Sequence, residues 1–300
     1  MRGKDKRAAV KKLKSLVFTQ KAEPIPFRNK IESQFSVFFL PNNVERTEKN
    51  YNSVVCDLLR PVAFAKERLI IYIHGGSFVG GSRASWRSFA SSLAHASATE
   101  LLLPEIRLAP EYPFPSALDD IEVVFTALSK DTRDIILCGD GTGGTIALSF
   151  ALFAKKTLRD KIKKLVLFSP FLDFSPDSAL LQIKKISDAL ISTESIRRMA
   201  DTYTYASNLA NPMVSPLCAS EDDLKNLKQV YIQMGEDEII LPDARRFATK
   251  LGYAAVPHIL DVWPGMIHFF QMADDCIPEA HKAIEKVAAF IKCNEESKSL

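Results

Sequence analysis

Short apolar runs alternate with longer amphipathic stretches through most of this chain. Two runs, Leu69–Ile73 and Leu165–Phe168, are continuously apolar, which is typical of strands buried on both faces of a sheet. Other segments repeat apolar residues every three or four positions, as in Ile284, Val287 and Ile291, and this spacing predicts amphipathic helices. The alternation of the two patterns predicts a mostly parallel sheet covered by helices.

The fold class expected from this pattern is α/β, a mixed, mostly parallel eight-stranded sheet with helices on both faces and a helical cap. The expected strands are Ser36–Leu40, Ser53–Leu59, Leu69–His74, Glu100–Leu103, Asp134–Cys138, Lys164–Phe168, Gln229–Met234 and His258–Trp263. The expected helices are Ala84–Ala96, Ser116–Leu128, Thr142–Lys155, Pro242–Leu251 and Glu279–Cys293. We expect the first two strands to form an antiparallel edge.

Two segments do not follow the alternation. Residues 1–45 precede it, and residues 177–211 interrupt it with helical sequence. Both are expected to be cap elements over a site, because the chain shows no repeat and no Gly/Ser-rich linker that would separate further domains. A chain of 300 residues with 47% hydrophobic content can bury one large core, so residues 1–300 are expected to form a single domain.

Charge and cysteine content exclude several classes of function. A net charge of +3 does not favour nucleic acid as a partner. The first fourteen residues are rich in Lys and Arg, and this run is expected to be a solvated helix face, with an arm that binds a membrane surface or nucleic acid as the alternative. No segment approaches the roughly 18 apolar residues of a transmembrane helix. The cysteines are odd in number and lack metal-type spacing, which predicts reduced thiols in a cytoplasmic protein without a bound metal. They are Cys56, Cys138, Cys218, Cys276 and Cys293.

The segment Gly139–Gly144 has the spacing of a nucleophile elbow but carries no nucleophile. In the pattern G-x-S-x-G a strand turns sharply into a helix, and the central Ser projects its hydroxyl into the active site. Here an apolar strand precedes the segment and a helical pattern follows it. The central position is Gly141, which has no side chain.

Three further features fit the chemistry of such a site. His74, Gly75 and Gly76 follow a buried strand, where a Gly-rich loop can present backbone amides to a developing oxyanion. A later strand ends in the acidic run Glu236–Glu238, and ligands of open α/β sheets lie beyond such strand ends. His268 follows the next strand, so loop, elbow, acid and histidine occur in the order that this chemistry uses.

Together these segments resemble the hormone-sensitive-lipase-like carboxylesterases of the α/β-hydrolase fold. The resemblance covers about residues 50 to 292 and is specific as a set. It is carried by the segments His74–Gly76, Arg107–Glu111, Pro113–Pro115, Gly139–Gly144, Ser169–Asp173, Pro212–Leu217, Glu238–Asp243 and Trp263–His268. It implies small carboxylic esters as ligands, no cofactor and no metal, and it leaves a homodimer open because family members often dimerise.

The resemblance places the oxyanion donors on the amides of Gly75, Gly76 and Thr142. Two of the surrounding positions depart from the family pattern. Ser77 stands where a third Gly is usual, and Thr142 stands where a small Ala is usual. We do not expect the hydroxyl of either residue to replace the missing nucleophile. The elbow aims only its tip residue, and not Thr142, at the site. Ser77 would have to attack from the side that holds the carbonyl oxygen.

The resemblance places the base on His268, the acid on Glu238 with Asp237 as the alternative, and the nucleophile on Gly141. Without an Oγ atom the family's acyl-enzyme cannot form, so hydrolysis is expected to be strongly impaired, as in a pseudoenzyme. Two alternatives stay open. The chain is a non-catalytic receptor for a small ester or carboxylate, or Gly141 is an engineered replacement in an active esterase; the departures at Ser77 and Thr142 favour natural divergence.

Overall fold

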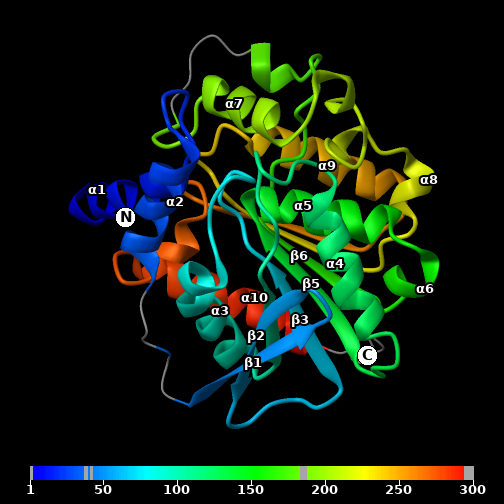
Figure 1. The fold of residues 1–300 in the computed structure, drawn as a ribbon. Coiled ribbons are helices and arrows are strands. Elements are labelled where there is room, and N and C mark those ends of the chain that lie inside the picture. The colour runs from blue at the N-terminus through cyan, green and yellow to red at the C-terminus, as the bar shows by residue number, and fades with distance from the viewer. Residues whose placement is uncertain (1–2, 37–39, 41–42, 183–187, 294–300) are drawn as a thin grey trace.

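A computed structural model describes residues 3–36, 40, 43–182 and 188–293. The strands of this part of the chain form one eight-stranded sheet flanked by helices (Figure 1). In space the strands follow the order β1-β2-β4-β3-β5-β6-β7-β8. Their bounds are β1 Val44–Tyr51, β2 Val54–Pro61, β3 Arg68–Ile73, β4 Glu100–Pro104, β5 Asp134–Asp140, β6 Ile162–Phe168, β7 Val230–Gly235 and β8 His258–Trp263.

The sheet is mixed at one edge and parallel elsewhere. Strand β2 pairs antiparallel with both β1 and β4, and all other neighbours pair in parallel. This confirms the predicted fold class. The central strands are apolar on both faces, and in β3 every side chain from Leu69 to Ile73 is almost fully buried.

The first strand is not the one that the hydrophobic pattern predicted. The described edge strand is Val44–Tyr51, a largely polar and exposed segment. The hydrophobic pattern did not predict this strand because the segment is polar. An edge strand with both faces near solvent needs no alternation of apolar and polar residues. The predicted strand Ser36–Leu40 lies largely outside the described residues; of its ends, Ser36 follows a helix and Leu40 is not in a strand.

All five predicted helices are present, with ends shifted by one or two residues. The α-helices are α1 Gly3–Leu13, α2 Pro24–Phe35, α3 Arg83–Ser97, α4 Ser116–Ala127, α5 Gly141–Phe153, α6 Lys156–Arg159, α7 Thr193–Tyr203, α8 Glu221–Leu224, α9 Leu241–Tyr253 and α10 Pro278–Lys292. Helices α3 and α10 pack together on one face of the sheet, while α4, α5, α8 and α9 cover the other (Figure 1). None of these helices combines the length and apolar character needed to cross a bilayer, within the residues described.

The N-terminal segment lies against the strand ends that carry the candidate site. Helix α2 packs on α3, and α1 packs on the 3-10 helix η5, Phe270–Ala273 (Figure 1). Between them the 3-10 helix η1, Lys14–Leu16, leads into the buried side chains Val17 and Phe18. Two basic residues of α1 form ion pairs, Lys6 with Asp237 and Lys12 with Asp275. Part of the basic run therefore binds the protein's own carboxylates.

Candidate active site

Strand β5 turns directly into α5 at Gly141. Gly141 has φ +49°, in the left-handed region that a sharp strand-to-helix turn requires. Residues with a side chain rarely adopt this backbone conformation. A Cβ atom built on Gly141 would lie 3.6 Å from Nε2 of His268 and 3.8 Å from the ring of Phe171. These are ordinary contact distances, so the turn has room for a side chain, and that side chain would point at the imidazole.

Glycine is also required two residues further on. A Cβ atom at Gly143 would lie 2.3 Å from the carbonyl oxygen of Ile73 and 2.4 Å from that of His74. Any larger residue would push the first turn of α5 away from the end of β3. Gly143 therefore allows the elbow and the loop after β3 to approach closely enough to share one site.

Glu238 and His268 form a buried pair. Nδ1 of His268 lies 2.9 Å from Oε2 of Glu238, and the two residues are only 8% and 4% exposed. The other carboxylate oxygen of Glu238 accepts hydrogen bonds from the Ser169 hydroxyl at 2.7 Å and from the Gly235 amide. Ser169 in turn accepts one from the Phe269 amide at 3.1 Å, which ties the histidine loop to the acid. The imidazole is therefore held in one orientation.

The surroundings of this pair raise the pKa of His268. Burial lowers the pKa of His268, but the hydrogen bond and negative charge of Glu238 outweigh burial, and the net pKa is raised above 6.5. Asp188 and Asp140 contribute in the same direction. Asp188 lies in the 177–211 segment and also accepts a hydrogen bond from the Ile239 amide at 2.9 Å.

Asp237 does not face His268 in the structure. Its side chain is 37% exposed and forms an ion pair with Lys6 of helix α1. The alternative acid therefore lies one residue away from the position that meets the imidazole, and the geometry favours Glu238.

Gly75 does not present its amide to the site, which corrects the expectation drawn for this residue. Its N–H donates to Oδ1 of Asp140 at 3.0 Å and is therefore already engaged. Gly76, Ser77 and Thr142 instead line one small cavity together with Gly141 and His268. Thr142 belongs to the first turn of α5, where backbone amides have no partner within the helix.

Asp140 is a site residue that the sequence did not reveal. It is 2% exposed, and its Oδ1 also accepts hydrogen bonds from the Tyr72 hydroxyl and the Trp86 indole, each at 2.8 Å. Burial raises the pKa of Asp140 to about 7, and the donors only partly oppose the shift. The only local signal is an acidic residue at the end of an apolar strand, because all three donors come from distant segments.

The hydroxyls of Ser77 and Thr142 are both occupied. Thr142 Oγ1 accepts a hydrogen bond from the Phe78 amide at 3.1 Å. Ser77 Oγ accepts from the Phe18 amide and donates to the Leu16 carbonyl, both at 3.2 Å. Ser77 thereby fastens the N-terminal segment to the loop after β3.

The shared cavity has room for about one water molecule, with about 10 Å³ open to the water's centre. Leu16 reaches it from the N-terminal segment and Ile191 from the 177–211 segment. The remaining side chains of its lining are Trp86, Asp140, Phe171 and Phe269. The site is therefore nearly closed.

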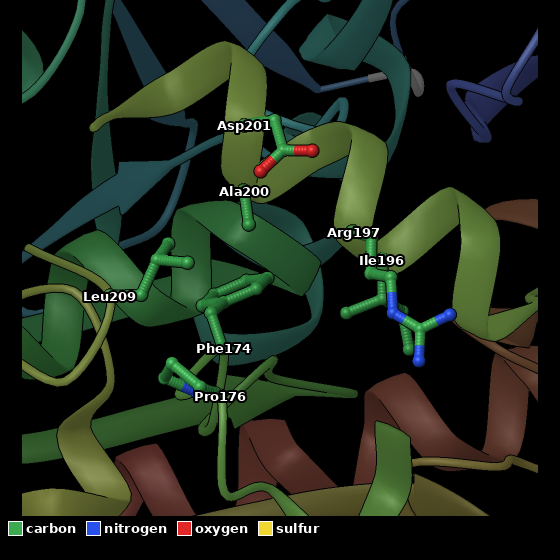
Figure 2. A pocket seen from close by; sticks show the side chains of 7 residues that line it. All are labelled: Phe174, Pro176, Ile196, Arg197, Ala200, Asp201 and Leu209. Carbon is green, nitrogen blue, oxygen red and sulfur yellow. The ribbon is translucent and has the colours of Figure 1, made fainter. Parts of the chain in front are cut away.

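A larger pocket of about 230 Å³ lies between helix α7 and the loop after β6 (Figure 2). Phe174 lines this pocket, with Ala200 of α7 above its ring and Leu209 to its left in the view of Figure 2. Phe174 lies 5.9 Å from Phe171, and Phe171 lies 5.3 Å from the His268 ring, measured between ring centroids. A continuous path of ring contacts thus runs from this pocket to the imidazole.

The described residues hold no cluster of three or more His, Cys, Asp or Glu side chains arranged to bind a metal ion. None of the five cysteines forms a disulfide within the described residues, and Cys56 and Cys138 are buried.

Comparison with known proteins gives consistent results. The model of a family described as alpha/beta hydrolase fold matches residues 70–272. An esterase of Acinetobacter venetianus is 35% identical over 227 residues, 74% of each chain. An acetyl-hydrolase of Streptomyces hygroscopicus is 31% identical over 232 residues, 75% of each chain. The crystal structure of an esterase from the bacterial hormone-sensitive lipase family superposes with a TM-score of 0.86 at 25% identity, covering 97% of this chain and 98% of that one.

Proposed function

This chain belongs to the hormone-sensitive-lipase-like branch of the α/β-hydrolase family, and we propose that it binds small carboxylic esters with strongly impaired hydrolysis. The observation that carries the proposal is the geometry at Gly141. A side chain there would meet Nε2 of His268, whose orientation Glu238 holds, but glycine supplies no Oγ atom. The esterases and the acetyl-hydrolase among its relatives support the ester chemistry.

In this proposal the residues of the site take the following roles. The amides of Gly76, Ser77 and Thr142 face the oxygen of the bound carbonyl, with Ser77 in the place first expected for Gly75. Helix α5 points its N-terminus at the same spot, and the helix dipole favours negative charge there. His268 accepts and returns a proton, and Glu238 keeps the proton of the imidazole on Nδ1. The part of the ester that extends away from the carbonyl reaches toward the pocket lined by Phe174, Ile196 and Leu209, and the packed rings between this pocket and His268 must shift to admit it.

We propose that residues 1–45 and 177–211 act as cap elements. Leu16 and Ile191, one from each segment, contribute to the wall of the small cavity. Hydrogen bonds from Ser77 to residues 16 and 18 hold the first segment in place, and Asp188 ties the second to the loop of the acid. A cytoplasmic location remains part of the proposal, supported by the lack of disulfides among the described cysteines. A homodimer does too, supported by the open edge of β8, where Ile259 is 46% exposed.

A receptor for a small ester or carboxylate is the second candidate. The nearly closed cavity and the absent hydroxyl favour retention of a ligand over its turnover. An engineered origin of Gly141 would leave the same site, and it makes the same prediction for a serine at this position.

The test replaces Gly141 and measures hydrolysis of p-nitrophenyl acetate and butyrate. We expect Gly141→Ser to raise kcat by at least about 10³-fold, since losing the nucleophile of a comparable triad costs about 10⁶-fold. Gly141→Ala is the matched control, because it adds the same Cβ without a hydroxyl and should stay inactive. A folded Gly141→Ser variant that remains inert would refute the proposal and favour the receptor. A rapid burst of p-nitrophenol from the unmodified chain would refute the impairment.

A further inference from the structure

We infer that the hollow beside Gly141 holds a water molecule that His268 activates, so that the unmodified chain hydrolyses small esters slowly by direct attack of water. The inference rests on the proposed function and adds a route of its own to it. No acyl-enzyme forms on this route, which separates it from the two-step reaction of a serine esterase.

The orientation of His268 supports this role. Nδ1 faces the carboxylate of Glu238 at 2.9 Å, so the proton of the neutral ring resides on Nδ1 and Nε2 keeps a free lone pair. Nε2 points to the space that a side chain at position 141 would fill, 3.6 Å from the Cβ position. A water molecule in that space lies within the hydrogen-bond reach of about 2.6–3.2 Å that general-base catalysis needs.

The size and polarity of the cavity match one water molecule. Its volume is about that of a single water, and a buried water needs two to four polar partners. His268 and Asp140 line the same cavity and carry polar groups that can be such partners, which leaves the amides of Gly76 and Thr142 for the carbonyl oxygen of the ester. An apolar hollow of this size would instead stay dry.

The hydroxyls near Gly141 in the described part of the chain are already engaged. Ser77 binds the backbone of residues 16 and 18, and Thr142 accepts from Phe78. Thr145 donates to the carbonyl of Phe171 at 2.7 Å. Water is therefore better placed to attack than any of these three side chains.

The reaction balances with water as the only co-reactant. The water oxygen forms a bond to the acyl carbon while Nε2 of His268 takes one of its protons. The electron pair of the carbonyl moves onto its oxygen, where the amides of Gly76 and Thr142 stabilise the charge. When the bond to the leaving oxygen breaks, Nε2 returns the proton to that oxygen, which gives an acid, an alcohol and a neutral imidazole.

The walls of the cavity limit the substrate. Leu16 and Ile191 must move aside to admit the acyl group, because the cavity as it stands accepts little more than water. An acetyl group requires the smallest displacement. Acetate esters are therefore the expected substrates of this route, and butyrate esters should react more slowly.

The experiment measures steady-state hydrolysis of p-nitrophenyl acetate by the full chain and by three variants purified in parallel. His268→Ala should lower the rate above buffer by about 10²-fold or more, the usual contribution of a general base. Gly141→Ala should lower it similarly, because its methyl group fills the hollow and displaces the water. His281→Ala, which changes an exposed histidine on α10, is the control and should leave the rate unchanged.

Two further readouts identify the route. Phenylmethylsulfonyl fluoride should not inhibit the unmodified chain, and intact mass spectrometry should find no acetyl adduct. The rate should also rise with pH through a midpoint above 6.5, since only neutral His268 accepts a proton and the facing carboxylates of Glu238, Asp188 and Asp140 raise its pKa.

The Gly141→Ser variant separates a failure of this inference from a failure of the proposed function. If the unmodified chain matches buffer, or if either His268→Ala or Gly141→Ala keeps its full rate, direct attack by water is wrong. An acetyl adduct would also overturn it. In all these cases an active Gly141→Ser variant leaves the proposed function standing, whereas an inert one removes both. Thermal unfolding of each variant shows whether a lost rate reflects a lost fold.

Discussion

The two halves of the candidate site differ in how completely they are built. On one side, the loops after β7 and β8 hold Glu238 and His268 in a buried network with Ser169, and both oxygens of the carboxylate have partners. On the other side, the elbow keeps its backbone turn and its close contact with β3 but has no side chain at its tip. The comparison shows that the orientation of the base does not depend on the nucleophile, because all contacts that hold His268 come from elsewhere.

The largest expected effect tests the half of the site that holds Glu238 and His268. In the Gly141→Ser background, Glu238→Gln should lower kcat by about 10⁴-fold, as an acid-to-amide change does in a comparable triad, because the amide no longer stabilises the protonated imidazole. Asp237→Asn is the matched control and should change kcat little, since Asp237 pairs with Lys6. Steady-state kinetics with p-nitrophenyl acetate decides the matter. Equal losses in both variants would mean that the acid is not specifically Glu238.

The next effect concerns Asp140, which ends strand β5 just before the elbow turn at Gly141. Burial raises the pKa of Asp140 from 3.8 to about 7, so between these values the folded chain holds a proton that the unfolded chain has released. The free energy of unfolding therefore falls as pH rises from about 4 to 7, by on the order of 1 kcal/mol per pH unit. Asp140→Asn keeps an oxygen for the three donors and should remove the part of this fall that Asp140 causes, while Asp243, whose pKa burial raises to about 6, keeps its own part.

Urea unfolding at several pH values between 4 and 6 measures this pH dependence of the free energy of unfolding, with Asp237→Asn as the control. The raised pKa of His268 acts in a separate window: its stabilisation is fully present below pH 6.5 and is lost as pH rises through the folded-state pKa. If the slope between pH 4 and 6 is the same in Asp140→Asn as in the unmodified chain, then Asp140 is not protonated in the fold.

The smallest effect tests the open space at the elbow. Gly141→Ala should lower the free energy of unfolding by about 1–2 kcal/mol, the strain of a left-handed conformation for a residue with a Cβ. Gly265→Ala is the matched control, because Gly265 also has a positive φ, +65°, and its Cβ would contact nothing within 4 Å. The two losses, measured by urea unfolding, should agree. A much larger loss at position 141 would show that no room for a side chain exists there.

Local pattern predicted most of the fold and part of the site. The central strands are buried on both faces and therefore appear as apolar runs, as in Leu69–Ile73. The strand Val44–Tyr51 was missed because its exposed position at the edge removes that signal. The expectation for Gly75 was wrong because its amide donates a hydrogen bond to Asp140, which lies 65 residues away in the chain.

The sequence by itself determined the order of the buried strands and of the helices between them, the elbow at residues 139–144 and the absence of a nucleophile at Gly141. These properties depend on hydrophobic spacing and on the identity of single residues, which are local. Only the tertiary structure decided that Glu238 and not Asp237 faces His268, and that the Ser77 hydroxyl binds the N-terminal segment. The same holds for the closure of the cavity by Leu16 and Ile191. Each of these depends on hydrogen bonds and packing between segments far apart in the chain, whose distances no local pattern encodes.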